Sequence, residues 1–160
     1  TIVSFDEDLD VIEWFNEEIG GAPVIAEASF EPYRCNSSRI SIGTGLPSVL
    51  GWQRHQQQQR YPDVLPQRYE DLRRLYGTSS VDEKLAIVAR YDVHYIIVGD
   101  LERSYPMVYG NDCVPMSNVP QYADLVLESG IAMFDQMVGD TLEVAFTSGD
   151  TVVYRVIGNT

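Results

Sequence analysis

The sequence has few basic residues and no long apolar run. Lysine and arginine together number 11, against 24 aspartates and glutamates, which gives a formal net charge of −13 at pH 7. Nucleic acid and anionic lipid surfaces would repel such a chain, and no basic cluster offsets the charge locally, so we expect no nucleic acid partner. No apolar run approaches the ~20 residues that a membrane-spanning helix requires.

Several signatures of catalysis and cofactor binding are also missing. The sequence has no Walker phosphate-binding loop, no Rossmann glycine triplet, no His-Glu-x-x-His zinc helix and no Gly-x-Ser-x-Gly nucleophile elbow. The only cysteines, Cys35 and Cys113, cannot make a disulfide framework or a four-cysteine zinc site, and are either paired or buried as free thiols. We therefore expect no cofactor and no metal.

What remains is enough for one globular domain. The 160 residues are 44% hydrophobic and 11% aromatic, which suffices to build a core, and no internal repeat or linker divides them. The chain begins with Thr1 rather than Met and shows no signal-peptide pattern. We expect a single soluble domain over residues 1–160, excised from a longer protein.

Five runs of residues predict strands. Apolar runs at 23–29, 39–43 and 93–99 predict inner strands, the last of them rich in β-branched residues. Alternating runs at 142–147 and 151–157 flank a short glycine-containing turn and predict a hairpin. With helices between the inner strands, the expected fold is α/β: a mixed sheet of about five strands, parallel inside, with a C-terminal antiparallel hairpin and helices packed on it.

The first helix is predicted from an acidic stretch at 6–10, followed by apolar residues at helical spacing and ended by Gly20 and Gly21. The acids Asp6, Asp8, Asp10 and Glu17 also match the ligand spacing of an EF-hand calcium loop. Because Val11 stands where that loop requires glycine, we prefer the helix.

Further helices are predicted over 68–76, from a Ser80 and Glu83 capping box to Tyr91, and over 121–138 with a break at Ser129 and Gly130. Residues 104–120 contain three prolines and are predicted to form a surface loop or partial lid.

Residues 39–60 hold most of the groups that could bind a ligand. Gly43, Gly45 and Pro47 shape a loop that either presents amides and hydroxyls to a ligand or forms a plain turn. Trp52 and His55 are three positions apart and would share one face of a helix, which suits a sugar or another polyol. A lone histidine is nevertheless more often structural than catalytic.

Glu27 lies at the carboxyl end of a predicted strand, where ligands commonly bind in α/β sheets. It either contacts a ligand or pairs with an arginine such as Arg39. A self-contained enzyme would need Glu27 and His55 to converge, together with Asp100 or Glu102, as acid and base. The other histidine, His94, lies inside a predicted strand, and we expect it to be packed.

Five segments carry a resemblance to a known family. They are Ala-Pro-Val-Ile-Ala-Glu-Ala at 22–28, Tyr33, Ser-Arg-Ile-Ser-Ile-Gly-Thr-Gly-Leu-Pro-Ser-Val-Leu-Gly-Trp-Gln-Arg-His at 38–55, Tyr-Asp-Val-His-Tyr-Ile-Ile-Val-Gly-Asp-Leu-Glu-Arg at 91–103, and Val-Val-Tyr-Arg-Val at 152–156. Over nearly its whole length the chain resembles the carboxyl-terminal soluble region of the Chlor_Arch_YYY (DUF2298) family of polytopic membrane proteins of unknown function.

Proteins of that family are similar to multi-pass, lipid-sugar-dependent glycosyltransferases, whose membrane half carries the catalytic acids. The resemblance implies a soluble domain on the extracytoplasmic side of the cell membrane, with the transmembrane portion of the same polypeptide as its partner. Cys35 and Cys113 would be exposed to oxidation there.

The resemblance further implies a glycan or a lipid-linked sugar acceptor as the ligand. The residues expected to contact it are Glu27, Tyr33, Arg39, Ser41, Thr44, Trp52, His55 and Arg60. The isolated chain is not expected to be catalytic, and Glu27 and His55 are its only candidates for that role. Two alternatives stay open: a docking module for the membrane half without a ligand of its own, and an independent acid-base hydrolase or transferase.

Overall fold

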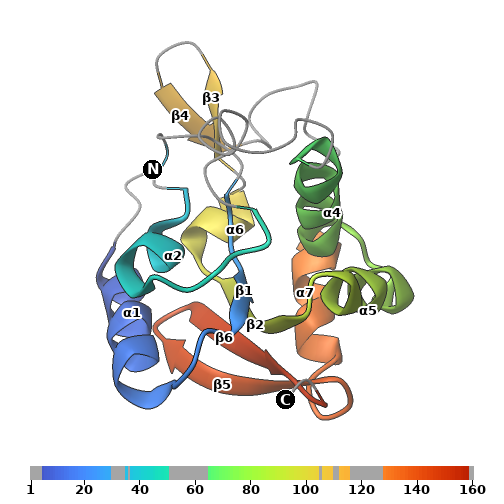
Figure 1. Ribbon diagram of the computed structural model, residues 1–160. Coiled ribbons are helices and arrows are strands. Elements are labelled where there is room, and N and C mark those ends of the chain that lie inside the picture. The colour runs from blue at the N-terminus through green and yellow to red at the C-terminus, as the bar shows by residue number, and fades with distance from the viewer. Residues whose placement is uncertain are drawn as a thin grey trace.

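A mixed sheet with helices on both faces forms the centre of the molecule (Figure 1). This computed structural model describes residues 5–29, 35, 37–50, 65–104, 106–109, 112–115 and 128–158. The sheet has the order β1-β2-β6-β5, formed by β1 (Val24–Ala26), β2 (Val93–Val98), β6 (Thr151–Val156) and β5 (Leu142–Ser148). β1 and β2 are parallel, and the other pairs are antiparallel. The predicted α/β fold with a mixed sheet and a C-terminal hairpin is confirmed.

Strand β2 lies inside the sheet because both of its faces are apolar. Tyr95 and Ile97 belong to an apolar cluster on one face, and Ile96 and Val98 to a larger cluster on the other. Successive side chains of a strand point to opposite faces, so one run of six residues contributes to both clusters. β2 thereby separates the two layers of helices.

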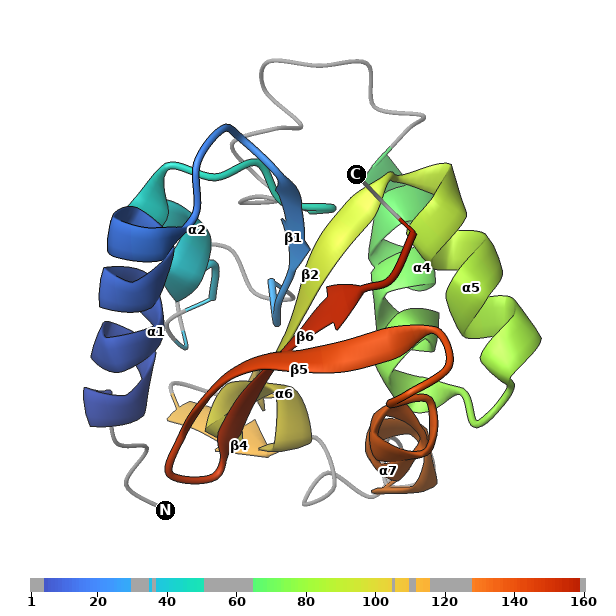
Figure 2. The ribbon, with the colours of Figure 1, turned by 90° about the horizontal axis from the view of Figure 1, so that it is seen from below.

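One face of the sheet is covered by α1 (Asp6–Glu18) and α2 (Arg39–Thr44), which lie side by side in Figures 1 and 2. The α1 residues Val11 and Phe15 pack against the sheet, as the apolar spacing predicted. The acids that matched an EF-hand spacing lie on or directly beside α1 and not in a loop. Residues 39–43, predicted as a strand, are instead helical, so that prediction is wrong.

The opposite face is covered by α4 (Leu65–Gly77), α5 (Val81–Arg90) and α7 (Glu128–Gln136) (Figure 2). Ser80 caps α5 as predicted, because its hydroxyl accepts a hydrogen bond from the Glu83 amide at 3.3 Å. Ser129 and Gly130, where a break was predicted, lie in the first turn of α7, and residues 121–127 lie outside the described ranges. A Cβ on Gly130 would lie 2.5 Å from the Tyr76 carbonyl oxygen, so this glycine allows α7 to approach the end of α4 closely.

The segment after β2 is more regular than the sequence predicts. It contains α6 (Asp100–Ser104), β3 (Pro106–Tyr109) and β4 (Asp112–Pro115), of which the last two pair as a separate antiparallel ribbon. The prediction of a surface loop over 104–120 is therefore wrong for residues 106–109 and 112–115, and residues 105, 110, 111 and 116–120 lie outside the described ranges. Among the residues that the structure describes, no helix has the length and apolar character needed to cross a membrane.

Candidate functional site

A buried group of charges lies where β1 and β2 end, the edge at which ligands commonly bind in α/β sheets. It consists of Asp8 on α1, Glu27 after β1, Arg39 on α2 and Glu102 on α6, and we call these four residues the charge cluster. Glu27 and Glu102 are 0% exposed and Arg39 is 9% exposed. Residues far apart in sequence are thus joined inside the protein.

Glu102 holds the guanidinium of Arg39 with both carboxylate oxygens. Arg39 Nη2 donates to Oε1 at 2.8 Å and Nη1 donates to Oε2 at 2.9 Å, a two-pronged arrangement that suits a planar guanidinium. The backbone amides of Gly99 and Ala28 donate to the same carboxylate at 2.8 and 2.6 Å. Glu102 therefore ties together the ends of both parallel strands.

Glu27 holds the first turn of α2. Its oxygens accept hydrogen bonds from the backbone amides of Ile40 at 3.1 Å and Ser41 at 2.7 Å, and Arg39 Nη1 donates to it at 3.4 Å. A carboxylate at a helix N-terminus satisfies free N–H groups and favours the helix dipole. This explains why residues 39–43 form a helix despite their strand-like alternation.

Asp8 completes the charge cluster from α1. Its Oδ2 lies 2.9 Å from Arg39 Nε, which is an ion-pair distance. The N–H of Nε is not directed at that oxygen, so the contact lacks the geometry of a hydrogen bond. The sequence predicted Asp8 as an acid near a helix start, with a calcium ligand as the less favoured alternative. Asp8 lies one turn before Val11 on the buried side of α1, and this spacing is the signal that could have identified it.

The protonation of the charge cluster is set by burial and by Arg39. Burial raises the pKa of Glu27 to about 7, although Arg39 and two amides oppose the shift. Burial likewise raises the pKa of Asp8, again against Arg39. Burial would also raise the pKa of Glu102, but Arg39 and the amides of Ala28 and Gly99 outweigh it and hold that pKa below its usual value. The charge cluster can therefore bind a proton near neutral pH, on the carboxyl of Glu27.

Ser41 and Thr44 shape the chain that leaves α2. The Ser41 hydroxyl donates to the Leu46 carbonyl at 2.8 Å, and the Thr44 hydroxyl donates to the Ile40 carbonyl at 2.7 Å. Gly45 adopts a positive φ of 75°, which ends the helix. The Ile25 amide then donates to the Pro47 carbonyl at 2.9 Å, which fixes this turn beside β1.

The structure brings together four of the eight predicted ligand-binding residues. Glu27 and Arg39 are paired, which is one of the two alternatives given for Glu27, and Ser41 and Thr44 lie on the same short helix. The other four predicted residues lie outside the described ranges: Tyr33, Trp52, His55 and Arg60. The side chains of Glu27 and Glu102 are enclosed, so the charge cluster can hold elements in place but offers these two carboxylates to no external ligand.

Cys35 and Cys113 are joined by a disulfide bond. Their Cα atoms lie 5.5 Å apart and 78 residues separate them in sequence. The bond ties the chain that precedes α2 to strand β4. The choice between paired and free thiols, which the sequence left open, is thereby decided. Within the described part of the chain, no three acidic, histidine or cysteine residues are grouped so that they could hold a metal ion.

Comparison with known proteins finds solved structures that have the same fold. No protein-family model and no curated protein matches the sequence, so the resemblance to the Chlor_Arch_YYY family stays a prediction. Two solved structures are similar over nearly the whole chain, both described as the C-terminal globular domain of oligosaccharyltransferase from Archaeoglobus fulgidus. The first, of the enzyme AfAglB-S2, has a TM-score of 0.54 and 10% identity and covers 92% of this chain and 95% of its own. The second has a TM-score of 0.51 and 14% identity, with 99% of both chains covered. At such identities, the chain shares the fold of these domains.

Proposed function

We propose that this chain is the extracytoplasmic domain of a glycosyltransferase-like integral membrane protein and that it assists the binding of a glycan or an acceptor. The observation that carries the proposal is the fold. Over 92% and 99% of its length, the chain matches C-terminal globular domains of oligosaccharyltransferase. In this proposal residues 1–160 are one soluble domain of a longer polypeptide, whose transmembrane portion is its partner.

The charge cluster supports the proposal as a scaffold. Arg39, Glu27, Ser41 and Thr44 are all engaged in fixing α2 and the turn after it, which ends at the buried residue Leu50. The chain that follows carries the other predicted ligand-binding residues: Trp52, His55 and Arg60. Four of the predicted residues thus fix the described chain up to Leu50, and in this proposal ligand contact falls to residues 51–60.

The disulfide supports the extracytoplasmic side. Disulfide bonds persist in oxidising compartments and are rare where thiol reductants are abundant. The bond between Cys35 and Cys113 therefore fits a domain outside the cytoplasm.

An NMR titration of the isotopically labelled chain with mono- and oligosaccharides tests glycan binding. The proposal predicts that a glycan shifts the indole N–H signal of Trp52 and that His55→Ala weakens binding. His94→Ala is the matched control, since His94 is the other of the two histidines and lies on β2. If no saccharide shifts Trp52, or if both histidine variants weaken binding equally, glycan binding by this segment is rejected.

A docking function is the second candidate, because two aliphatic side chains on neighbouring helices are exposed. Leu9 on α1 is 61% exposed and Ile42 on α2 is 59% exposed. Photo-crosslinking tests this function. Benzoylphenylalanine replaces Ile42 within the parent membrane protein, and the control replaces Val144, an exposed residue on β5. Crosslinks to transmembrane segments from position 42 alone would support docking, and equal yields from both positions would contradict it. The acid-base hydrolase is not proposed, since Glu27 is fully enclosed.

A further inference from the structure

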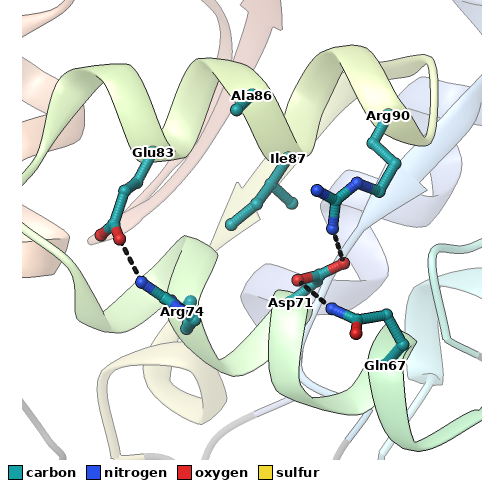
Figure 3. A pocket seen from close by; sticks show the side chains of 7 residues that line it. All are labelled: Gln67, Asp71, Arg74, Glu83, Ala86, Ile87 and Arg90. Atoms are coloured by element: carbon teal, nitrogen blue, oxygen red, sulfur yellow. Dashed lines mark hydrogen bonds and ion pairs between the residues drawn. The ribbon is translucent and has the colours of Figure 1, made fainter.

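A groove lies between α4 and α5 (Figure 3), two helices that cover the face of the sheet opposite α1 and α2 (Figure 2). Its volume is about 240 Å³. Pockets for drug-sized ligands span roughly 300–1,000 Å³, so this groove has room for one small ring and not for an extended chain. We call it the interhelix groove. It shares no residue with the segment to which glycan contact is assigned above.

Two ion pairs form the ends of the interhelix groove. Arg74 on α4 pairs with Glu83 on α5, and Arg90 on α5 pairs with Asp71 on α4 at 2.6 Å. Gln67 steadies the second pair, because its Nε2 donates to Asp71 Oδ1 at 2.9 Å. Figure 3 shows the two pairs at opposite ends of the groove, with Ala86 and Ile87 on the α5 side between them.

The charges that line the interhelix groove cancel. Each arginine faces one carboxylate, although the chain as a whole carries a net charge of −13. A charged ligand would unbalance one of these pairs, and an anion would also meet the negative potential of the whole protein. The lining therefore favours a ligand without net charge.

The paired side chains keep spare hydrogen-bonding capacity. A guanidinium has five N–H donors, and Arg74 and Arg90 are still 52% and 54% exposed although each is paired. The Glu83 carboxylate is 40% exposed and retains acceptor sites beyond its bonds to Arg74 and Thr78. Donors and acceptors thus lie at the rim of one small groove, held in position by their mutual ion pairs.

We propose that the interhelix groove binds an uncharged, polyhydroxylated ring of monosaccharide size. Each hydroxyl of such a ligand both donates and accepts, so it can bond to the free guanidinium N–H groups and to the carboxylate oxygens without breaking an ion pair. The carbon face of the ring would lie against Ala86 and Ile87. Because buried residues of α4 and α5 belong to the core beneath them, this site is preformed.

An NMR titration with the methyl glycosides of glucose, mannose and galactose tests the proposal. We expect at least one glycoside to shift the amide signals of Ala86 and Ile87 and the side-chain N–H signals of Gln67, Arg74 and Arg90. Glucuronate and glucosamine are the charged controls and should shift these signals less. The proposal is overturned if no neutral glycoside shifts them, or if a charged control binds more tightly than every neutral glycoside.

A matched pair of variants locates the binding. Ala86→Leu places a larger side chain in the groove, whereas Ala89→Leu makes the same change at an exposed position of α5 that does not line it. Leucine is a good helix former, so both variants should fold, which thermal unfolding verifies. Ala86→Leu should weaken binding by about tenfold or more, a loss of about 1.4 kcal/mol, and Ala89→Leu should leave it unchanged. Equal affinities in the two variants would overturn the proposal. Shifts at Trp52 alone would also do so, while supporting the separate function proposed above.

Discussion

The two faces of the sheet each bury a cation, but they stabilise it in different ways. On the α1 and α2 side, Arg39 is surrounded by three carboxyls. On the α4, α5 and α7 side, Lys84, the only lysine in the sequence, is 0% exposed. Its ammonium donates to the Leu75 carbonyl at 2.5 Å and lies 3.9 Å from the centre of the Phe134 ring. Within the described ranges, no carboxylate lies at ion-pair distance from Lys84.

This difference follows from the chemistry of the two side chains. Arginine does not lose its proton in proteins, so a buried guanidinium requires negative partners, and those of Arg39 raise its pKa further although burial opposes this. Lysine can become neutral instead, and burial lowers the pKa of Lys84 to about 7. One face therefore contains a permanent charge, Arg39, with its counter-ions. The other contains Lys84, which can lose its charge by releasing a proton.

Methionine substitutions test this comparison most strongly. Arg39→Met would leave Glu27, Glu102 and Asp8 enclosed without their counter-ion, and we expect it to lower the free energy of unfolding by about 3–5 kcal/mol. Lys84→Met removes one hydrogen bond, but it also removes the cost of burying a lysine, so we expect the free energy of unfolding at pH 7 to be unchanged or higher. Urea denaturation followed by tryptophan fluorescence measures both. Equal losses in the two variants would contradict the distinction.

Removing the disulfide should affect the two faces unequally. Replacing Cys35 and Cys113 together by serine opens a link between residues 78 positions apart, and losses of about 2–5 kcal/mol are typical for native disulfides. Because the bond lies next to α2, hydrogen exchange should speed up in α2 more than in α4 and α5. A uniform increase over all helices would show that the disulfide does not act on the Arg39 side in particular.

The charge cluster should make stability fall as pH rises through the weakly acidic range. The pKa of Glu27 is raised from 4.5 to about 7, so the folded state binds more protons than the unfolded state between these values. The stabilisation is fully present below pH 4.5 and is lost as pH rises to about 7, with a slope of about 1 kcal/mol per pH unit. Asp8, whose pKa is also raised, gives a slope of the same sign above pH 3.8, whereas Glu102, whose pKa is lowered, gives a slope of the opposite sign only below pH 4.5.

Glu27→Gln isolates the contribution of Glu27. The variant should lose most of the slope between pH 4.5 and 7, whatever its absolute stability, because the amide does not titrate. Denaturation midpoints measured across this range give the slope. An unchanged slope in Glu27→Gln would mean that Glu27 is ionised throughout.

Lys84 should make stability rise with pH above pH 7, the opposite of the effect of Glu27. Its pKa is lowered from 10.5 to about 7, so the unfolded state binds more protons between these values and stability rises with pH over this range. The groups that face its ammonium are the Leu75 carbonyl and the Phe134 ring, and neither titrates. Lys84→Met should remove the rise. The destabilisation caused by the buried lysine is fully present below about pH 7 and is lost as pH rises to 10.5, so the variant and the native protein should differ most at the lower end of this range.

Local patterns predicted much of the fold. The apolar spacing of α1, the Ser80 cap of α5, the β-branched run of β2 and the alternating hairpin of β5 and β6 all identified their elements. The pattern failed at α2, because Glu27, twelve or more residues earlier in the chain, holds its first amides. The sequence of α2 itself therefore gives no sign of the contact that makes it helical.

The ribbon of β3 and β4 was missed for a different reason. Each strand is only four residues long, and a proline stands at Pro106 and Pro115, which counts against a strand assignment. The Gly110-Asn111 pair between the strands is a hairpin signal that could have indicated it.

The candidate site was predicted only in part. A pair between Glu27 and Arg39 was one of the two alternatives predicted for Glu27, and the structure contains it. Glu102 was predicted only as a possible acid-base partner of Glu27 and His55, and its pairing with Arg39 was not predicted. Whether Glu27 would face a ligand or an arginine depended on the geometry of the sheet edge, which the residue types do not contain. To predict that Asp8 belongs to the charge cluster, one would have to know which side of α1 packs against α2.

The position of β6 has a consequence for the synthesis of this protein. β6 is the last strand along the chain, yet in the order β1-β2-β6-β5 it lies between two others. Until residues 151–156 have left the ribosome, β2 has one open edge, and β5 has no partner in the sheet. An open apolar edge invites pairing with other chains. The nascent protein therefore depends on its final strand to close the sheet, and a chain truncated before Thr151 should be captured by chaperones or aggregate although both helical layers have been made.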